Sequence, residues 1–463
     1  MANYITDTIK VGDKTYEATE ALCGDGGAPV ETESITVEPM TSSQTLYPNT
    51  GKLINQVNVN AVTNEIDNNI QPDNIKKDVE ILGVTGTLVP ATGVDRLQWK
   101  CDNMKSLAYE FQNYTGTDYS ILDGLDMSKV ETFEAMFDGN SNMETLPTLD
   151  LSGLKNTEKD LYRLLNGCSS ITSATFDLKV PTQFVNCFGT LQTQNRYLDL
   201  TINNMQYVTS LKSAFTNCRI EKFNNGYDTF TFDLSNCTNL KEAFDYIIPS
   251  HAIDLELLNT QKVENWDNTF NFPNSIKSIN ELDCTGAKRL YYTFSSNTTN
   301  SLLTEIKVKN TQNCPSFYGF ASQNKYVETI RTLDLYSATN VSYITSSSPN
   351  LKNLTLKNIK ISLQIGSGTS WGHLLTNESL LNTAKELWDN TDNALGGTRT
   401  LTMATASKTN IQSIYVKLIT PTAEQEAEDP YINNKKPCVE CASTDEGAMT
   451  LEEYIISKNW SIA

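Results

Sequence analysis

One pattern recurs along most of the chain and limits what the chain can fold into. In its clearest copy, residues 121–152, an alternating Leu-Asp-Leu triplet at 149–151 follows three apolar residues at helical spacing, Val130, Phe133 and Phe137. The alternation is typical of a short strand, and the wider spacing predicts one face of a helical turn. The pair of signals returns at intervals of roughly 26 residues, as in repeats that stack into solenoids.

Further copies of both signals follow one another along the chain. The apolar segment returns as Met104-Leu107-Phe111, Val208-Leu211-Phe215, Cys237-Leu240-Phe244, Val263-Trp266-Phe270 and Ala287-Leu290-Phe294. The triplet returns at 176–178, 198–200, 232–234, 253–255, 282–284, 306–308, 333–335 and 354–356. These are about ten units, each too small to bury its own apolar face, so we expect one long stack of turns.

The wording of the repeat also resembles a known family. The phrases LDMSKVETFEAMFDGNSNM and LLNGCSSITSATFDL are similar to the BspA-like surface leucine-rich repeat, with its Leu-Asp-Leu-Ser strand and Gly-Cys-Ser-Ser-Leu segment. The resemblance covers residues 97–360. Family members are surface proteins of bacteria and protists and proteins encoded by phages of gut bacteria. The resemblance implies a leucine-rich-repeat solenoid displayed at a surface.

Composition agrees with an elongated object rather than a compact one. The chain has 463 residues, of which 39% are hydrophobic, as expected when every core residue lies near a surface. Its formal net charge of -19 repels phosphate backbones, so nucleic acid is not an expected partner. No apolar run is long enough for a membrane span, and residues 1–10 lack the pattern of a secretion signal.

Residues 1–95 differ from the repeats. Alternating segments at 34–37 and 54–59 predict strands of a small β-rich unit, and a brief helix is expected at 73–79. The phrase NIKKDVEILGVTGTL, residues 74–88, resembles part of a module found in tail and other virion proteins of phages that infect Bacillota and Bacteroidota. This resemblance implies that the N-terminal region anchors the protein to a virion.

Residues 366–463 are expected to cover the far end of the stack, because an uncovered terminal repeat exposes core side chains. The expected elements are a helix capped by Asn377 and carrying Leu380, Ala384, Leu387 and Trp388, a strand at 399–403, a helix opened by a capping box at 450–453, and a closing segment at 460–462. The wording resembles the terminal element of phage-encoded members of the repeat family. An acidic insertion at 420–447 departs from it and is expected to be an exposed loop.

Most of the ten cysteines are predicted to be buried free thiols. Most of them replace apolar residues at repeat positions, as Cys168 and Cys284 do, and free cysteine packs as a small hydrophobe. Cys438 and Cys441 form the one C-x-x-C pair, but a zinc site needs four ligands. A local disulfide or a pair of surface thiols is therefore the preferred interpretation.

One stretch satisfies a hydrolase pattern. Residues 368–372 read Gly-Thr-Ser-Trp-Gly, a G-x-S-x-G sequence centred on Ser370, and His373 follows. That pattern needs a strand before it, a helix after it and distant catalytic partners, whereas here it falls where the repeats end. We expect a simple turn and no enzymatic activity, with no catalytic, cofactor-binding or metal-binding residues. A carboxylate pair for glycoside hydrolysis is left open, because acidic residues are spread along the chain.

The aspartate at the centre of the triplets has two interpretations. Neighbouring turns would place such carboxylates about 4.8 Å apart, so they must be held by hydrogen bonds or by a cation such as calcium. We favour capping of the following turn through backbone N–H groups. The spacing further indicates two staggered sets, Asp177, Asp233 and Asp283 in one and Asp150, Asp199 and Asp254 in the other.

Four tyrosines near the predicted turns are the candidates for ligand contact. Tyr291, Tyr292, Tyr318 and Tyr343 either complete the core or form an exposed surface for saccharides or proteins, and the core interpretation is preferred.

Taken together, these features predict an α+β protein in three segments. They are a β-rich virion-anchoring module at 1–95, a leucine-rich-repeat solenoid at 96–365 and an α/β cap at 366–463. The expected function is that of a structural protein of a phage virion, a tail or head fibre or appendage that displays the solenoid for host attachment. A bacterial surface adhesin and a carbohydrate-active enzyme are the alternatives. Expected partners are other virion proteins, a host surface glycan or protein, and further copies of the chain, as in a homotrimer.

Overall fold

The computed structural model describes residues 3–11, 14–22, 31–37, 45–50, 52–59, 80–81, 84–85, 93–189, 196–271, 275–296, 301–368 and 374–463. The chain forms two compact units, Met1–Thr92 and Gly93–Ala463.

The first unit contains three pairs of strands. Antiparallel pairing joins β1 (Asn3–Val11) to β2 (Lys14–Leu22) and β5 (Glu80–Ile81) to β6 (Val84–Thr85), while β3 (Glu31–Val37) and β4 (Lys52–Val59) pair in parallel. The strands expected at 34–37 and 54–59 are confirmed within β3 and β4, whereas β1 and β2 were not predicted. The helix expected at 73–79 lies outside the described residues.

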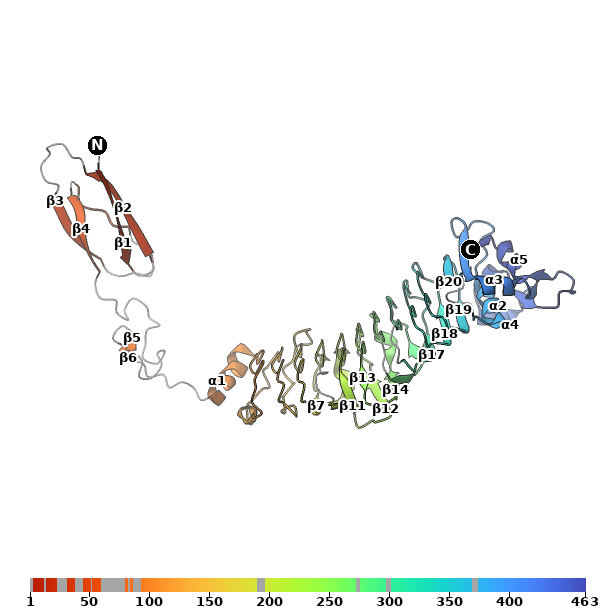
Figure 1. Ribbon diagram of the computed structural model, residues 1–463, viewed down its shortest axis with the longest axis horizontal. Helices are drawn as coiled ribbons and strands as arrows, with labels where there is room; N and C mark the ends of the chain where they lie inside the picture. Colours follow the sequence, from red (N-terminus) through yellow and green to blue (C-terminus); the bar gives the residue numbers. More distant parts are fainter. Residues whose placement is uncertain are drawn as a thin grey trace. The chain divides into compact units, whose positions relative to one another are not determined.

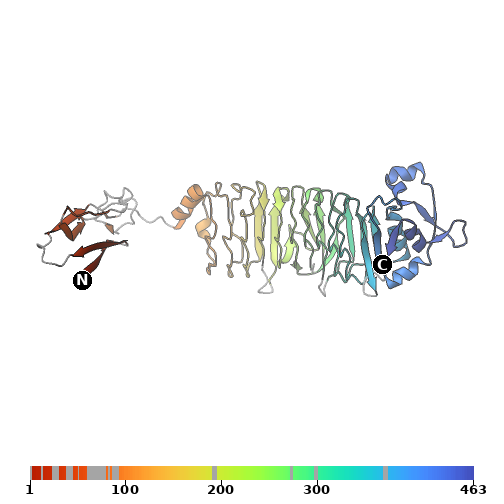
Figure 2. The same ribbon diagram turned by 90° about the horizontal axis from the view of Figure 1, so that it is seen from above.

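The second unit is a β-solenoid of about 11 turns. The turns follow one another along a curved stack, and the strands of successive turns lie side by side (Figures 1 and 2). One parallel sheet contains β13 (Ile248–Pro249), β11 (Arg219–Phe223), β9 (Leu198–Asn203) and β7 (Ser173–Asp177); another contains β12 (Thr229–Asp233), β14 (Ile253–Leu258) and β15 (Ile276–Ile279); and a third contains β16 (Leu282–Asp283), β17 (Glu305–Lys309), β18 (Thr329–Asp334) and β19 (Asn353–Lys357). In addition, β8 (Thr182–Gln183) pairs with β10 (Val208–Ser210).

Every triplet after residue 170 touches one of these strands, which confirms the period-two signal. The triplet at 149–151 is the exception, because it forms no strand. There, pairing with the following turn is made a few residues earlier, by Thr145 and Leu146 with Ser173.

The apolar segments at helical spacing are not helices, and this prediction was wrong. In the segment of Phe133 and Phe137, Ala135 has φ 50° and the N–H of Phe133 bonds the carbonyl of Asp160 in the next turn at 2.8 Å. The left-handed residue turns the chain, so residues three or four apart point to the same side although no helix forms. Equivalent positions with positive φ are Tyr109, Arg163, Asn186, Ser213, Glu242, Asn268, Tyr292, Gly319 and Tyr343. Each such L-residue costs on the order of 1 kcal/mol, which the bonds between turns must offset.

The burial predicted for these segments is nevertheless largely confirmed. Val130, Phe133 and Phe137 are fully buried, and equivalent phenylalanines stack through the turns as a ladder. The phenylalanine ladder consists of Phe188, Phe215, Phe244, Phe270 and Phe294, with successive ring centroids 5.0 to 5.7 Å apart. The cysteines at repeat positions are buried free thiols, as expected. Burial raises the pKa of the Cys168 thiol to about 12, so these thiols stay protonated.

Helices lie at both ends of the stack (Figure 1). At the first end, α1 (Gly93–Trp99) continues into a π-helical turn, η2 (Lys100–Met104), and buries Leu97 and Cys101. Met104, expected in the core, is 56% exposed, because the core position at this end belongs to Cys101. Short 3-10 turns occur at η3 (Ser120–Leu122), η4 (Met205–Tyr207) and η5 (Thr260–Lys262).

In its described residues, the C-terminal part of the second unit contains two small sheets and four helices, one of them in the insertion at 420–447. Strands β20 (Leu363–Gly368), β21 (Arg399–Ala404) and β25 (Trp460–Ile462) pair in parallel, and β22 (Tyr415–Leu418) pairs antiparallel with β23 (Cys438–Glu440) and β24 (Met449–Thr450). The other three helices are α2 (Asn377–Glu386), α3 (Thr405–Ile411) and α5 (Leu451–Ser457). The strand at 399–403 and the capping box at Thr450 are confirmed, whereas α2 is capped by Thr376 rather than by Asn377.

The insertion at 420–447 is not simply an exposed loop, which corrects the expectation. It contains α4 (Ala423–Glu428), which starts with a capping box, and the 3-10 turn η6 (Ile432–Lys435). Lys435 is only 3% exposed, and its Nζ lies 2.5 Å from Glu386 and 2.8 Å from Asp429. An ion pair with α2 therefore anchors the insertion to the rest of the unit. No helix in the described part of the chain is long and apolar enough to span a membrane.

Candidate functional site

From Asp177 to Asn358, the strand ends form a column in which acidic turns alternate with amide turns. Strands that end in aspartate alternate with strands that are followed by an asparagine of positive φ. The side-chain amide of each such asparagine donates a hydrogen bond to the aspartate of the preceding turn. Asn204 Nδ2 lies 3.3 Å from Asp177, and Asn259 Nδ2 lies 3.0 Å from Asp233. The same pairing joins Asn310 to Asp283 and Asn358 to Asp334.

This alternation confirms the two staggered sets and explains them. Asp177 lies opposite Asn203, whereas Asp199 lies opposite Ser173, four residues earlier in the same strand. From Asp177 onward, two strand-end aspartates are therefore separated by an amide turn, so like charges do not face each other in neighbouring turns of this part of the solenoid. Asp150 caps its turn in the same manner as the strand-end set, so its assignment to the other set was wrong.

Capping, rather than a cation, accounts for the strand-end carboxylates. Asp233 accepts from the N–H of Ser235 at 3.1 Å, and Asp283 from that of Thr285 at 3.0 Å. Against the opposing effect of burial, such hydrogen bonds lower the pKa of Asp283. Over the described ranges, no group of three or more His, Cys, Asp or Glu residues is arranged to hold a metal ion. The column therefore stabilises the stack.

The four candidate tyrosines form one cluster on the outside of the solenoid. Tyr291 and Tyr318, from neighbouring turns, stack with centroids 5.0 Å apart and planes 9° apart. Tyr292 meets Tyr318 edge to face at 5.4 Å, and Tyr343 extends the contact to the next turn at 5.5 Å. Tyr291 is 38% exposed and Tyr343 50% exposed. The preferred interpretation, that these residues complete the core, is therefore wrong. We call Tyr291, Tyr292, Tyr318 and Tyr343 the tyrosine cluster.

A glycine makes room for the cluster. Gly319 occupies the position equivalent to Tyr292 and Tyr343 in its own turn, and a Cβ there would lie 2.4 Å from the ring of Tyr292. The ring of Tyr292 therefore lies across the backbone of the next turn and reaches Tyr318. Burial and a hydrogen bond with Tyr318 raise the pKa of the Tyr292 hydroxyl to about 12.

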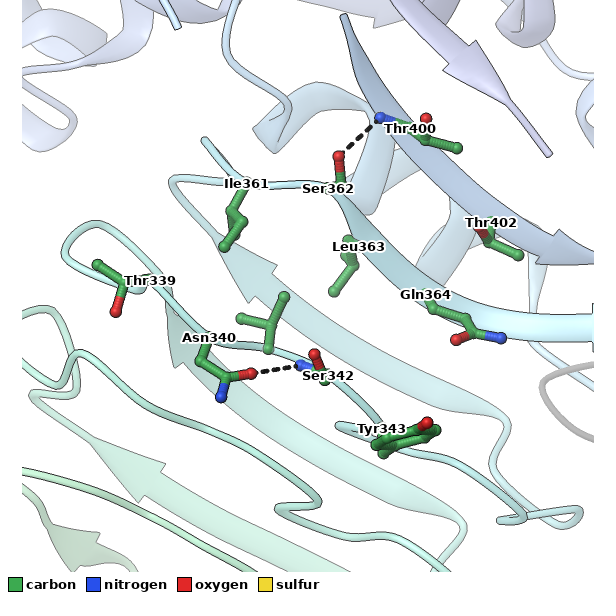
Figure 3. A pocket seen from close by; sticks show the side chains of 11 residues that line it. Thr339, Asn340, Ser342, Tyr343, Ile361, Ser362, Leu363, Gln364, Thr400 and Thr402 are labelled. Carbon is green, nitrogen blue, oxygen red and sulfur yellow. Dashed lines mark hydrogen bonds between the residues drawn. The ribbon is translucent and has the colours of Figure 1, made fainter. Parts of the chain in front are cut away.

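The cluster leads directly into a cleft, because Tyr343 belongs to both (Figure 3). The cleft has a volume of about 320 Å³ and lies between the turn at 339–343, β20 and β21. Gln364 and Thr402 are paired neighbours across these two strands. The rest of the lining is Thr339, Asn340, Val341, Ser342, Ile361, Ser362, Leu363 and Thr400.

The lining favours a neutral polar ligand. It offers hydroxyl and amide groups but no charged side chain. Some of these groups are already used: the N–H of Ser342 donates to Asn340, and that of Thr400 donates to the Ser362 hydroxyl, each at 3.1 Å (Figure 3). Together, exposed aromatic faces and adaptable hydrogen-bonding groups suit a sugar, whose C–H faces stack on rings and whose hydroxyls both donate and accept.

The remaining sequence candidates do not join this site. Cys438 and Cys441 are free thiols, and Cys438 is buried rather than at the surface, as one interpretation had placed it. His251 stacks on Tyr227, with centroids 3.9 Å apart, in the middle of the solenoid. Residues 369–373, which include Ser370 and His373, lie outside the described residues.

Sequence reasoning found the tyrosines but missed the cleft. Its residues come from three separate segments, and the one available signal was the alternation at 399–403, which places Thr400 and Thr402 on one face of a strand. Comparisons with known protein families, with curated proteins and with solved structures give no match for this chain.

Proposed function

We propose that the chain is a structural protein of a phage virion, a fibre or appendage on tail or head, whose solenoid binds a neutral glycan on the host surface. The observation that carries the binding role is the exposed tyrosine cluster leading into an uncharged cleft. The resemblance of residues 1–95 to a virion module supports the location. On this proposal the solenoid is a BspA-like leucine-rich repeat and residues 366–463 form its α/β cap.

The binding mode follows from the geometry. A sugar ring packs against the exposed Tyr291, which Tyr318 supports from behind, and the next sugar of the chain passes Tyr343 into the cleft. There, Gln364 and Thr402 exchange hydrogen bonds with its hydroxyl groups. Because the cleft lining has no charge and the whole chain is acidic, neutral glycans are preferred over anionic ones. The proposed role is binding without catalysis.

The virion location is tested by mass spectrometry of purified particles, in which peptides of this chain should be present. A bacterial surface adhesin is the alternative, because it would use the same cluster and cleft. Peptides found in the cell envelope of bacteria free of phage, and absent from particles, would favour the adhesin.

The binding role is tested separately with the full-length protein on an array of neutral and acidic oligosaccharides. Tyr318→Ala and Tyr343→Ala should each weaken binding to neutral glycans by about fivefold, since packing of a sugar on a tyrosine ring contributes on the order of 1 kcal/mol. Tyr227→Ala is the matched control, because Tyr227 is an exposed ring away from the cluster. If all three variants bound glycans equally, the tyrosine cluster would not be part of the glycan-binding site.

Assembly is a further part of the proposal. Fibre proteins attach as symmetric oligomers, and a first unit of under a hundred residues has little core of its own. We expect a homotrimer, which multi-angle light scattering would detect as three times the chain mass. A monomer at micromolar concentration would contradict this expectation.

A further inference from the structure

Two aromatic rings contact a lysine where the last solenoid turns meet the C-terminal segment, and a third ring packs against both of them. Tyr336 and Tyr431 stack with centroids 4.6 Å apart, and Trp388 lies 6.0 Å from the first and 5.7 Å from the second. The ammonium of Lys360 lies 3.2 Å from the centroid of the Tyr336 ring and 4.0 Å from that of Trp388. We call Tyr336, Trp388 and Tyr431 the aromatic cage.

The cage is assembled from distant parts of the sequence. Tyr336 follows β18, Trp388 follows α2, and Tyr431 belongs to the insertion at 420–447. Asp429 accepts from the N–H of Tyr431 and pairs with Lys435, so the buried ion pair that anchors the insertion also positions this ring. The insertion therefore supplies one wall of the cage.

Lys360 is held there by the rings rather than by a salt bridge. Within the described ranges, no carboxylate forms an ion pair with Lys360, although most lysines of the solenoid have one. The indole N–H of Trp388 likewise has no acceptor in the described part of the chain, so Trp388 acts through its ring face. A hydrogen bond with Tyr431 and the charge of Lys360 lower the pKa of the Tyr336 hydroxyl.

A primary ammonium is a poor match for such a site. It is compact and strongly hydrated, so its attraction to ring faces is offset by the loss of bound water. A quaternary ammonium group has no N–H to hydrate and presents methyl groups to the two rings that now face the lysine, Tyr336 and Trp388. The hydrogen bond with Tyr336 and burial raise the pKa of the Tyr431 hydroxyl, and the nearby carboxylates of Asp334 and Asp429 add to this effect, so they would also favour a cation at this position.

We propose that the aromatic cage is a binding site for a quaternary ammonium group of the choline type, and that Lys360 occupies the cage when this ligand is absent. The ligand displaces the ammonium of Lys360 into solvent and takes its place against Tyr336 and Trp388, which Tyr431 holds in position. This site is separate from the tyrosine cluster and its cleft, and it gives the insertion a binding role.

Isothermal titration of the full-length protein with choline and with 3,3-dimethylbutanol tests the proposal. The alcohol has the same shape but no charge, so choline should bind about tenfold more tightly if attraction between cation and rings holds it. Lys360→Ala removes the internal occupant and should strengthen choline binding several-fold. Lys352→Ala, which changes an exposed lysine paired with Glu328, should leave it unchanged.

Loss of the rings should abolish the choline signal. Tyr431→Leu is the cleanest variant, because that ring lies at the surface of the insertion, and Trp388→Leu is the second. Melting temperatures within a few degrees of the parent protein show that each variant is folded. No saturable choline binding to folded Lys360→Ala would overturn the proposal and leave Lys360 as a structural clamp. Equal affinity for choline and the neutral alcohol would also overturn it.

Discussion

The phenylalanine ladder and the tyrosine cluster are built by equivalent segments of successive turns, yet they differ in burial and geometry. Phe294 follows Tyr292 by two residues, and one ring points inward while the other points outward. Inside, Phe215, Phe244 and Phe270 are nearly parallel, with planes 2° and 4° apart. Outside, the tyrosine contacts mix a stack at 9° with edges near 80°. Packing fixes the phenylalanine ladder to one arrangement, whereas the tyrosine cluster lies at the surface of the solenoid, where we propose that it binds a glycan.

Among the variants that distinguish the phenylalanine ladder from the tyrosine cluster, Phe215→Ala is expected to have the largest effect on stability. Phe215 contacts two ladder neighbours and Phe232, so its truncation should reduce the free energy of unfolding by about 3 to 5 kcal/mol. Damage should spread to adjacent turns, because each turn packs only on its neighbours. Chemical denaturation measures the loss, with Tyr318→Ala as the control that should retain nearly full stability. If both variants lost similar free energy of unfolding, the phenylalanine ladder and the tyrosine cluster would contribute equally to stability, and the distinction between them would be wrong.

A smaller loss of stability is expected when a phenylalanine of the ladder is replaced by tyrosine, the residue type of the outer cluster. Phe244→Tyr places a hydroxyl in the fully buried ladder, where it has no water and must find a partner. An unsatisfied buried hydroxyl costs roughly 1 to 3 kcal/mol. The reverse exchange, Tyr318→Phe, should leave the melting temperature almost unchanged. A stable Phe244→Tyr protein would mean that the interior is less tightly packed than the ladder indicates.

Gly319→Ala should disturb the tyrosine cluster and leave the phenylalanine ladder intact. The added Cβ would meet the Tyr292 ring at 2.4 Å, and alanine at φ 63° is strained. The ring can swing away, so the expected loss of stability is about 1 kcal/mol. Glycan binding should fall much more than stability, because Tyr292 leaves Tyr318. Unchanged glycan binding would show that Tyr292 does not help to position the cluster.

The smallest expected effect depends on pH and concerns a carboxyl group next to the phenylalanine ladder. Asp245 follows Phe244 directly, and burial, assisted by the charge of Glu242, raises the pKa of its carboxyl from 3.8 to about 7. Since the folded state holds this proton more tightly than the unfolded state, stability is fully present below about pH 4 and falls as pH rises through 7. Asp245→Asn should therefore melt slightly higher than the parent above pH 7. The difference should be under about 1 kcal/mol, since solvent screens a half-buried group. Identical melting curves at pH 5 and pH 8 would contradict the shift.

The repeat could be predicted from the sequence because burial leaves a periodic trace. Phe133, Phe215 and Phe270 return at fixed intervals whatever the backbone does between them. The backbone itself could not be predicted, because spacing of three or four residues does not distinguish a helix from a turn with one left-handed residue. Glu242 and Arg163 adopt that conformation although their residue types give no sign of it. Bonds to the neighbouring turn decide the conformation, and these are invisible in a single unit.

The sites were predictable to different degrees. Tyr291 and Tyr318 could be named from their positions near turns. Whether their rings point into the core or to the outside of the solenoid could not be predicted. The cleft and the aromatic cage each require contacts between segments that only the three-dimensional stack brings together. Lys360 and Tyr431, for example, carry no local signal, and the insertion that contains Tyr431 reads as a polar loop.

The alternation of acidic and amide turns also bears on how a protein of this kind can change in length during evolution. Deleting or duplicating a single turn would bring Asp233 beside Asp283, or Asn259 beside Asn310, and would lose the bond that joins each amide to a carboxylate. Within residues 173–358, deleting or duplicating two turns together leaves every junction as it was. In this part of the solenoid the inherited building block is therefore the pair of turns, and relatives whose solenoids differ in length here should differ by an even number of turns.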